Sequence, residues 1–287
     1  MRLVYDLINF LFYSNLWIAM AAIALSAQSR WLLTYRLQWT PLYGVIFFGT
    51  LFLYALHRLV GMKKVDSFTG QTRFAIVEKF KTHIFLYAVV AAAGGLWCLL
   101  QLPQSLIWAL LPVALVSLIY VLPVLPSGKR GRDISFVKIF MIAISWSWVT
   151  VFLPALEVKM TWSIAFYLMF LERLFFIFAI ALPFDIRDMA IDRHNRVQTI
   201  PSRFGIKSSK IMAAIVLVFM LSMVWLNYCI DAYSWASCIA LGISALTTFS
   251  LVYFADKHQH DYYFSGLIDG AMILQCVLVL IFNYIAN

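Results

Sequence analysis

The sequence predicts an all-α, polytopic membrane protein with nine transmembrane helices in a bundle around a central cavity. Of its 287 residues, 63% are hydrophobic and only 12% are charged, whereas a soluble domain has about 25% charged residues. Mean hydropathy is +0.87, and the apolar residues fall into runs of about 20, the length that crosses a bilayer. No polar segment is long enough to form a second core, so we expect a single membrane domain over residues 1–287.

Nine apolar runs are candidates for membrane spans. They cover residues 7–27, 40–61, 80–100, 105–125, 136–156, 161–183, 209–230, 233–254 and 264–285. Very short links join three pairs of spans, at Gln101–Gln104, Glu157–Met160 and Ile230–Ala232. Longer polar segments alternate with them, at 62–79, 126–135, 184–208 and 255–263. This alternation places most of the polar surface on one side of the membrane. No clear signal-peptide cleavage site closes the first run, so we expect it to remain in the protein as a membrane helix.

Basic residues are concentrated on the side of the long segments, and the opposite side carries only Arg30, Arg36 and Lys159. Cytoplasmic loops carry an excess of Lys and Arg, so we expect the long segments and the N-terminus to be cytoplasmic and the C-terminus to be outside. The net charge of +9 is explained by this topology and by anionic lipid headgroups. The sequence therefore indicates a lipid bilayer as partner, no nucleic acid, and no obligate protein partner.

All four cysteines lie inside apolar runs. They are Cys98, Cys229, Cys238 and Cys276. Their spacing is not that of a metal site or of a disulfide framework. We expect four reduced thiols, buried among packed side chains.

One acidic stretch stands out, PFDIRDMAIDRHNRVQTIPSRFG, which follows the sixth apolar run. Its residues Asp185, Asp188 and Asp192 are spaced i, i+3, i+7, so on a helix they share one face. Three like charges on one face repel each other unless a positive group binds them. Mg²⁺ commonly bridges a few carboxylates to a phosphate-bearing substrate, and it is the expected partner. The alternative is a solvated, charged loop between two membrane helices.

Several ionisable residues fall within the apolar runs. They are His57 and Arg58 in the second run, Lys138 in the fifth, and Glu172 and Arg173 in the sixth. Charges at membrane depth are costly and usually face the bundle interior or a wet cavity. For Arg58 we expect a place in such a cavity, whereas Lys138 either lines it or extends to the interface. Adjacent residues on a helix point about 100° apart, so Glu172 and Arg173 are not expected to pair.

A compact basic group follows the fourth run, in YVLPVLPSGKRGRD. Lys129, Arg130 and Arg132 either face lipid headgroups or bind phosphate, for which guanidinium and ammonium groups are suited. In the last run Asp269 stands beside Gly270. It is expected at a tight helix–helix contact or in the cavity wall.

Taken together, these features resemble the UbiA superfamily of membrane prenyltransferases over essentially the whole chain. The D-x-x-D-x-x-x-D helix matches its second acidic motif, and the segment Thr199–Gly205, TIPSRFG, is similar to its T-L-P-x-x-x-G. The weaker matches are Tyr120 followed by Lys129 and Arg130, and Asp269 followed by Gly270.

The resemblance implies a helical bundle around a cavity that opens to the membrane. It also implies Mg²⁺-dependent transfer of a prenyl group from an isoprenoid diphosphate to a lipophilic, usually aromatic, acceptor. Three aspartates would then be the catalytic metal ligands, namely Asp185, Asp188 and Asp192. Lys129 and Arg130 would contact the diphosphate, and Tyr120 would lie near it.

The chain departs from the family in its first acidic motif, N-D-x-x-D-x-x-x-D, which is expected near residues 54–66. The sequence there is YALHRLVGMKKVD, with His57 and Arg58 at the core of the expected site and no aspartate before Asp66. Arg58 could bind the diphosphate directly and so replace one Mg²⁺ by a fixed positive charge. The alternatives are another chemistry on a prenyl diphosphate, such as cyclisation, a non-catalytic relative that binds isoprenoid or lipid, or a small transporter. A transporter often shows two similar halves, and no internal repeat is evident.

Overall fold

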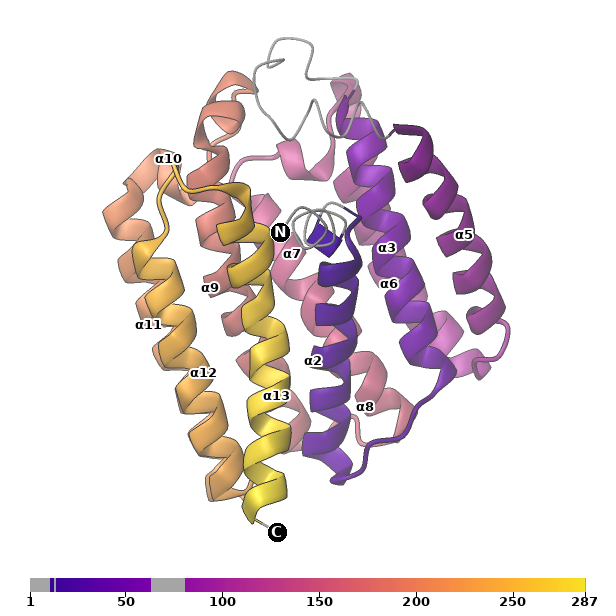
Figure 1. Cartoon of the computed structure of the whole chain (residues 1–287), viewed down its shortest axis with the longest axis vertical. Coiled ribbons are helices and arrows are strands. Elements are labelled where there is room, and N and C mark those ends of the chain that lie inside the picture. Colours follow the sequence, from indigo (N-terminus) through magenta and orange to yellow (C-terminus); the bar gives the residue numbers. More distant parts are fainter. Residues whose placement is uncertain (1–10, 13, 63–80, 287) are drawn as a thin grey trace, which may run out of the picture.

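A computed structural model describes residues 11–12, 14–62 and 81–286 of the chain (Figure 1). This described part is almost entirely helical, contains no strand, and has nine helices or helix combinations long and apolar enough to cross a membrane. The predicted fold class is therefore confirmed.

The spans follow one another through the sequence. They are α2 (Leu16–Thr34), α3 (Pro41–Met62), α5 (Lys81–Leu99), α6 (Gln104–Val121), α7 (Val137–Ser147) continued by η3 (Trp148–Phe152) and α8 (Leu153–Glu157), α9 (Ile164–His194), α11 (Ile206–Cys229), α12 (Trp235–Phe254), and η4 (Tyr263–Ile268) continued by α13 (Asp269–Ala286). The described connections between spans contain the short helices η1 (Pro126–Gly128), η2 (Gly131–Asp133) and α10 (Ile200–Phe204).

Two spans, α2 and α9, form the centre of the bundle. In them 61% and 56% of the apolar window is buried inside the protein, against 17% in α5 and α6. Helix α9 packs against α7 and α11, α2 packs against α13 and α3, and α3 packs against α5. Figure 1 shows the outer helices flanking this centre, with α11 and α12 on one side and α5 and α6 on the other.

Helix α2 differs from the first predicted span, 7–27, because it continues to Thr34 and begins at Leu16. Its polar residues Gln28, Ser29 and Arg30 lie beyond the predicted end of the span at residue 27, but they face the bundle interior. There they find partners instead of water: the Gln28 amide donates to Gln275 Oε1 at 3.2 Å, and Arg30 pairs with Glu157 at 2.5 Å. The predicted start at residue 7 lies outside the described residues.

Helix α9 also runs past its predicted end at residue 183 and continues to His194. The segment 184–208 is therefore not a long loop, and the acidic triplet lies on a regular helix. A proline inside a helix removes one hydrogen bond, and Pro183 does not end this one. The rest of the predicted loop contains α10, whose first turn is capped where the Thr199 N–H donates to Ser202 Oγ at 2.7 Å.

Helix α6 ends earlier than predicted, at Val121 instead of residue 125. Leu122 precedes Pro123, and a residue before proline is disfavoured in the helical conformation. Leu122 accordingly has extended backbone angles, with φ −88° and ψ 145°.

The charges within the sixth span are buried, as expected. Glu172 and Arg173 are 1% and 0% exposed, and each binds other partners. The Tyr233 hydroxyl donates to Glu172 Oε2 at 2.8 Å, and Arg173 donates to the Leu25 carbonyl at 3.2 Å and to Thr150 Oγ1 at 3.1 Å.

All four cysteines are free thiols, but the expectation that all are buried was wrong. Cys276 is buried, Cys98 and Cys238 are half-buried, and Cys229 is exposed at the end of α11. An apolar run does not reveal which face of an outer helix points away from the bundle.

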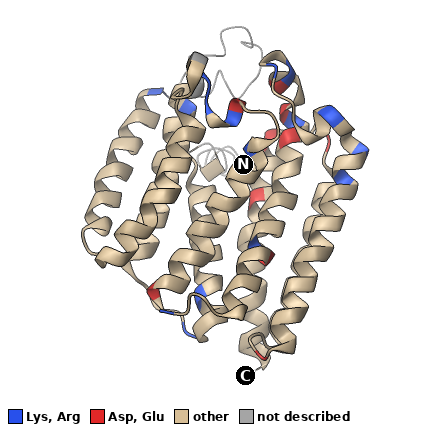
Figure 2. Cartoon of the chain, turned by 180° about the vertical axis from the view of Figure 1, so that it is seen from behind, with Lys and Arg blue, Asp and Glu red and all other residues tan. Residues whose placement is uncertain are grey.

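Charged residues gather at one end of the bundle, the end that carries η2 and α10 (Figure 2). The opposite end has few of them, and the C-terminus lies there. Most of the charged surface thus lies at one end of the bundle, as the alternation of long and short connections predicts.

Candidate functional site

A cavity of about 360 Å³ lies among α2, α3, α7, α9 and α13. Its lining changes character along each helix. On α9 the apolar residues Ile177 and Ile180 come first and the acidic triplet follows, while on α7 the order is reversed, with Lys138 before Ile142 and Trp146. Because α7 and α9 run in opposite directions, the polar groups meet at one end of the cavity and the apolar side chains line the other.

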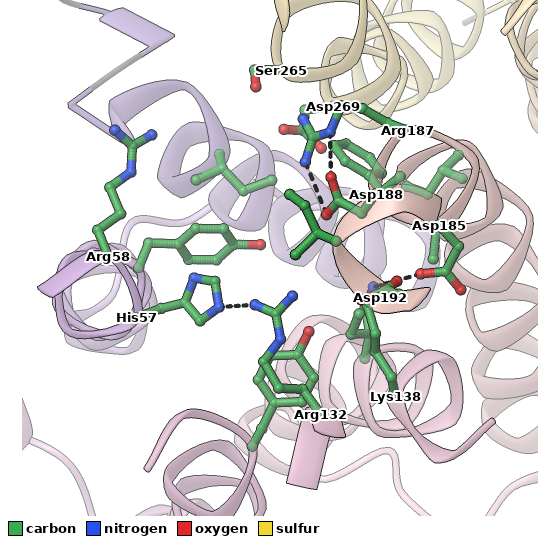
Figure 3. Close-up of a pocket in the computed structure, with 18 of the residues that line it drawn as sticks. His57, Arg58, Arg132, Lys138, Asp185, Arg187, Asp188, Asp192, Ser265 and Asp269 are labelled. Atoms are coloured by element: carbon green, nitrogen blue, oxygen red, sulfur yellow. Dashed lines mark hydrogen bonds and ion pairs between the residues drawn. The ribbon is translucent and has the colours of Figure 1, made fainter. Parts of the chain in front are cut away.

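The acidic triplet lies at the polar end, and two of its members share one lysine. Lys138 Nζ is 2.7 Å from Asp185 Oδ1 and 3.3 Å from Asp192 Oδ2 (Figure 3). The three side chains are buried, with Lys138 at 5% exposure. Lys138 therefore lines the cavity and does not extend to the interface.

The third carboxylate, Asp188, pairs with its neighbour on α9. Arg187 Nε is 2.9 Å from Asp188 Oδ1, and Nη1 of the same arginine is 3.8 Å from Asp261 Oδ1. The guanidinium carbon also lies 5.1 Å from the ring centres of both Phe184 and Phe264. Protein cations thus compensate the three aspartates, which repel each other less than the sequence alone suggested.

These carboxylates do not form a ready metal site. Within the described ranges, no three His, Cys, Asp or Glu side chains converge on one point that could hold a metal ion. Mg²⁺, however, usually keeps several waters and takes only one or two carboxylates together with substrate phosphates. The arrangement fits a metal ion that binds together with an anionic ligand better than one held by the protein alone.

The charges that line the cavity nearly cancel. The carboxylates are Asp133, Asp185, Asp188, Asp192, Asp261 and Asp269, and the cations are Arg58, Arg130, Arg132, Lys138 and Arg187. Counted with every side chain ionised, the described lining therefore has no net positive charge.

On the side of α3, Arg132 from η2 reaches into the cavity. Its Nη1 donates a hydrogen bond to His57 Nε2, and its guanidinium carbon lies 5.8 Å from the centre of the Tyr120 ring. Burial disfavours the charged form of Arg132, but Tyr120 and the carboxylates of Asp188 and Asp192 outweigh burial. The pKa of the Arg132 guanidinium is consequently raised above its ordinary value, and this residue is a permanent cation of the site.

The other basic residues around η2 are placed differently. Arg130 lines the cavity and is 6% exposed, but its guanidinium binds Asp133, with Nη2 at 2.9 Å from Oδ1 and Nε at 3.1 Å from Oδ2. Lys129 is exposed and does not line the cavity. The structure therefore brings Arg130 to the cavity, but not Lys129.

Tyr120 and Arg58 line the cavity as predicted. In Figure 3 the Arg58 side chain leads away from the contact between His57 and Arg132. The part of the expected first motif that includes Asp66 lies outside the described residues.

Asp269 lies in the cavity wall, which was one of its two expected places. A π-helical turn, η4, precedes it, and the Gly266 carbonyl in this turn accepts a hydrogen bond from the Trp17 indole at 3.0 Å. The contact joins α2 to the start of the last span beside Ser265 and Asp269.

The η2 turn is held against its surroundings by close packing and hydrogen bonds. A side chain on Gly131 would place Cβ 2.9 Å from Met141 Cε and 3.1 Å from the Ile119 carbonyl oxygen. The Phe136 N–H donates to the Gln198 carbonyl at 2.9 Å, which ties the segment after η2 to the segment after α9. The cations of η2 and the carboxylates of α9 are thereby fixed relative to each other.

The sequence did not single out three residues that line the cavity. Arg132 was named only together with Lys129 and Arg130, and neither Arg187 nor His57 was given a role. Only the general rule that ionisable residues inside spans face a cavity pointed to His57.

Comparisons with known proteins agree with this architecture. The sequence model of the UbiA prenyltransferase family matches residues 76–268, a range that begins after α3. No curated protein matches the sequence.

Several solved structures share the fold at low sequence identity. A UbiA homologue from Aeropyrum pernix K1 has a TM-score of 0.63 at 10% identity, with 96% of both chains covered. A UbiA homologue from Archaeoglobus fulgidus, solved with GPP and Mg²⁺, has a TM-score of 0.61 at 12% identity, with 94% of this chain and 99% of that chain covered. A structure from work on digeranylgeranylglyceryl phosphate synthase in membranes has a TM-score of 0.57 at 17% identity, with 97% of both chains covered.

Proposed function

Because the chain belongs to the UbiA prenyltransferase family, we propose that it transfers a prenyl group from an isoprenoid diphosphate to a lipophilic, aromatic acceptor within the membrane. The observation that carries the proposal is the cavity, which joins an apolar wall to a dense cluster of carboxylates and cations. A molecule with an apolar chain and a multiply charged anionic end is complementary to it. The homologues solved with GPP or DMAPP and Mg²⁺ support this class of donor.

The reaction we propose begins with cleavage of the allylic C–O bond. Negative charge builds on the leaving diphosphate, so the site must aim cations at it. Arg58, Arg130 and Arg132 are the residues for this role, with Tyr120 beside them, and Lys129 would have to move toward the cavity to join them. The apolar wall, including Trp146 and Ile177, holds the isoprenoid chain and keeps water from the allylic cation.

We also propose that the reaction requires Mg²⁺. Asp185, Asp188 and Asp192 are the residues that would hold it, and the metal would supply positive charge to the leaving diphosphate. The described lining has no net positive charge to offset the negative charge that a bound diphosphate would bring, and this supports the requirement. Because Lys138 and Arg187 now compensate these carboxylates, metal binding has to compete with, or rearrange, their ion pairs.

A second candidate function is binding of an isoprenoid diphosphate without turnover. The ion pairs of all three aspartates with protein cations favour it, as do His57 and Arg58 in place of the first acidic motif. In either case the proposed orientation is the same, with the N-terminus and the acidic end of α9 on the cytoplasmic side.

The test is release of diphosphate by the purified protein in nanodiscs, with Mg²⁺, labelled prenyl diphosphates of several lengths, and lipid-soluble aromatic acceptors. We expect Mg²⁺-dependent release by the unmodified protein and none by Asp188→Asn, while this variant remains folded. Asp256→Asn is the matched control, because Asp256 is exposed and outside the cavity lining. Turnover retained in Asp188→Asn would exclude the role given to Asp188. Mg²⁺-dependent binding without release would favour the second candidate.

A further inference from the structure

Arg132 differs from three other cations at the polar end of the cavity, Lys138, Arg130 and Arg187. Lys138 contacts two carboxylates, Arg130 is bound by Asp133, and Arg187 pairs with Asp188. Arg132, by contrast, makes no ion pair with any residue in the described part of the chain; its contacts are the His57 imidazole and the face of Tyr120. It is therefore a half-buried cation whose charge no contacting carboxylate in the described part of the chain neutralises.

The hydrogen bond between Arg132 and His57 fixes the state of the imidazole. A guanidinium has only donors and remains protonated, so His57 Nε2 must be the acceptor. A doubly protonated imidazole has no acceptor left, and His57 is consequently neutral with its proton on Nδ1. The ring holds the guanidinium in place without adding a negative charge to it.

A carboxylate at position 57 would act differently. It would also accept a hydrogen bond from Arg132, but it would form an ion pair and cancel the positive charge. A neutral acceptor separates two effects that usually come together, orientation of the arginine and neutralisation of it. The Tyr120 ring face likewise attracts the guanidinium without carrying a full negative charge.

We infer that His57 is a positioning residue, which orients Arg132 as the cation for the diphosphate of the donor and leaves its charge available. The inference rests on the proposed function for the identity of the ligand. Figure 3 shows the Arg132 guanidinium between His57 on α3 and the acidic face of α9. A diphosphate bound there would meet Arg132 on one side and the carboxylates, with their metal ion, on the other.

The test measures binding of inorganic pyrophosphate to the purified protein in nanodiscs by calorimetry, with and without Mg²⁺. Arg132→Gln should weaken binding by about 10- to 100-fold, the usual effect of losing a charge-assisted hydrogen bond in a dry site. His57→Gln keeps a neutral acceptor and should stay within about 3-fold of the unmodified protein. His57→Asp keeps an acceptor but adds charge, and it should weaken binding by roughly tenfold.

The control for the added charge is His258→Asp, because His258 is exposed and outside the cavity lining; its affinity for pyrophosphate should not change. Thermal unfolding of each variant identifies any that fail to fold. A merely structural role for His57 would make Gln and Asp equivalent once folding is accounted for, whereas the inference requires Asp to be worse than Gln.

Besides equal affinity of the two His57 variants, three outcomes overturn the inference: no saturable binding of pyrophosphate to the unmodified protein, unchanged affinity in Arg132→Gln, or tighter Mg²⁺-dependent binding in His57→Asp. The last would show that position 57 accepts a metal ligand. Failure of the proposed function can be distinguished from failure of this inference. If the protein binds pyrophosphate through Arg132 but releases no diphosphate from prenyl diphosphates, the inference stands and the proposed enzymatic activity is excluded.

Discussion

Lys138 illustrates how a single buried charge organises a set of carboxylates. Its ammonium group contacts Asp185 and Asp192, which lie on the same face of α9 about two turns apart, so one cation satisfies two anions. The spacing of the aspartates was visible in the sequence, and so was a lysine near the start of the fifth span. That the two meet depends on how α7 packs against α9, which no local pattern encodes.

Replacement of Lys138 by glutamine should destabilise the protein by about 3–5 kcal/mol, because it leaves two buried carboxylates without their counter-ion. Mg²⁺ should recover part of this loss, since the freed carboxylates can then bind a divalent cation. Thermal unfolding with and without Mg²⁺ measures both effects.

The matched control is Glu157→Gln, which breaks the ion pair with Arg30 at the opposite end of the bundle. This variant should also lose stability, but Mg²⁺ should not restore it. Equal recovery of the two variants by Mg²⁺ would contradict a metal-binding role for the carboxylates beside Lys138.

At the scale of the element, the η2 turn decides which basic residue enters the cavity. The sequence predicted a basic group in this segment but not that Arg132 would point inward and Lys129 outward. That outcome depends on the path of three residues, and Gly131 favours the path because a side chain there would crowd the Ile119 carbonyl and the end of the Met141 side chain.

Gly131→Ala should therefore displace η2 and weaken binding of pyrophosphate by several-fold or more, because Arg132 moves with the turn. Gly242→Ala is the control, since nothing lies within 4 Å of the added Cβ and alanine favours a helix over glycine by about 0.5–1 kcal/mol. Calorimetry reports the affinity of each variant. Unchanged affinity in Gly131→Ala would mean that the turn adapts without moving Arg132.

The boundaries of α2 and α9 show that a polar residue does not reliably mark the end of a membrane helix. Gln28 in α2 and Asp185 in α9 were both treated as the ends of apolar runs, yet both lie within continuous helices. Their side chains are satisfied by other helices, Gln28 by Gln275 and Asp185 by Lys138. A single sequence shows that a residue is polar, but not whether its partner will be water or protein.

For the whole molecule, composition and hydropathy were sufficient to predict a nine-span helical bundle, and the described residues bear this out. The order in which the spans surround the cavity was not predictable, because all of them are similarly apolar. A single domain over residues 1–287 remains a prediction, as does the orientation in the membrane.

The orientation can be tested with two single-cysteine variants in a background without the four native cysteines. Lys129 and Lys159 are both exposed, and they lie in connections at opposite ends of the bundle. A membrane-impermeant maleimide should label Lys159→Cys in right-side-out vesicles and Lys129→Cys only after permeabilisation. The reverse pattern would place the acidic end of α9 outside.

The length of α9 makes the bilayer itself a variable of the site. At about 1.5 Å per residue, the 31 residues of the helix extend roughly 46 Å, whereas the hydrocarbon core is about 30 Å thick. Asp185 lies roughly 32 Å from Ile164 along this axis, so the acidic face starts where the hydrocarbon ends if the helix enters the hydrocarbon at Ile164 and runs along the bilayer normal. Thicker membranes would draw the carboxylates toward the acyl chains, and hydrophobic mismatch would then limit the access of water and ions to them. Lipid chain length is thus expected to tune this site as directly as a substitution within it.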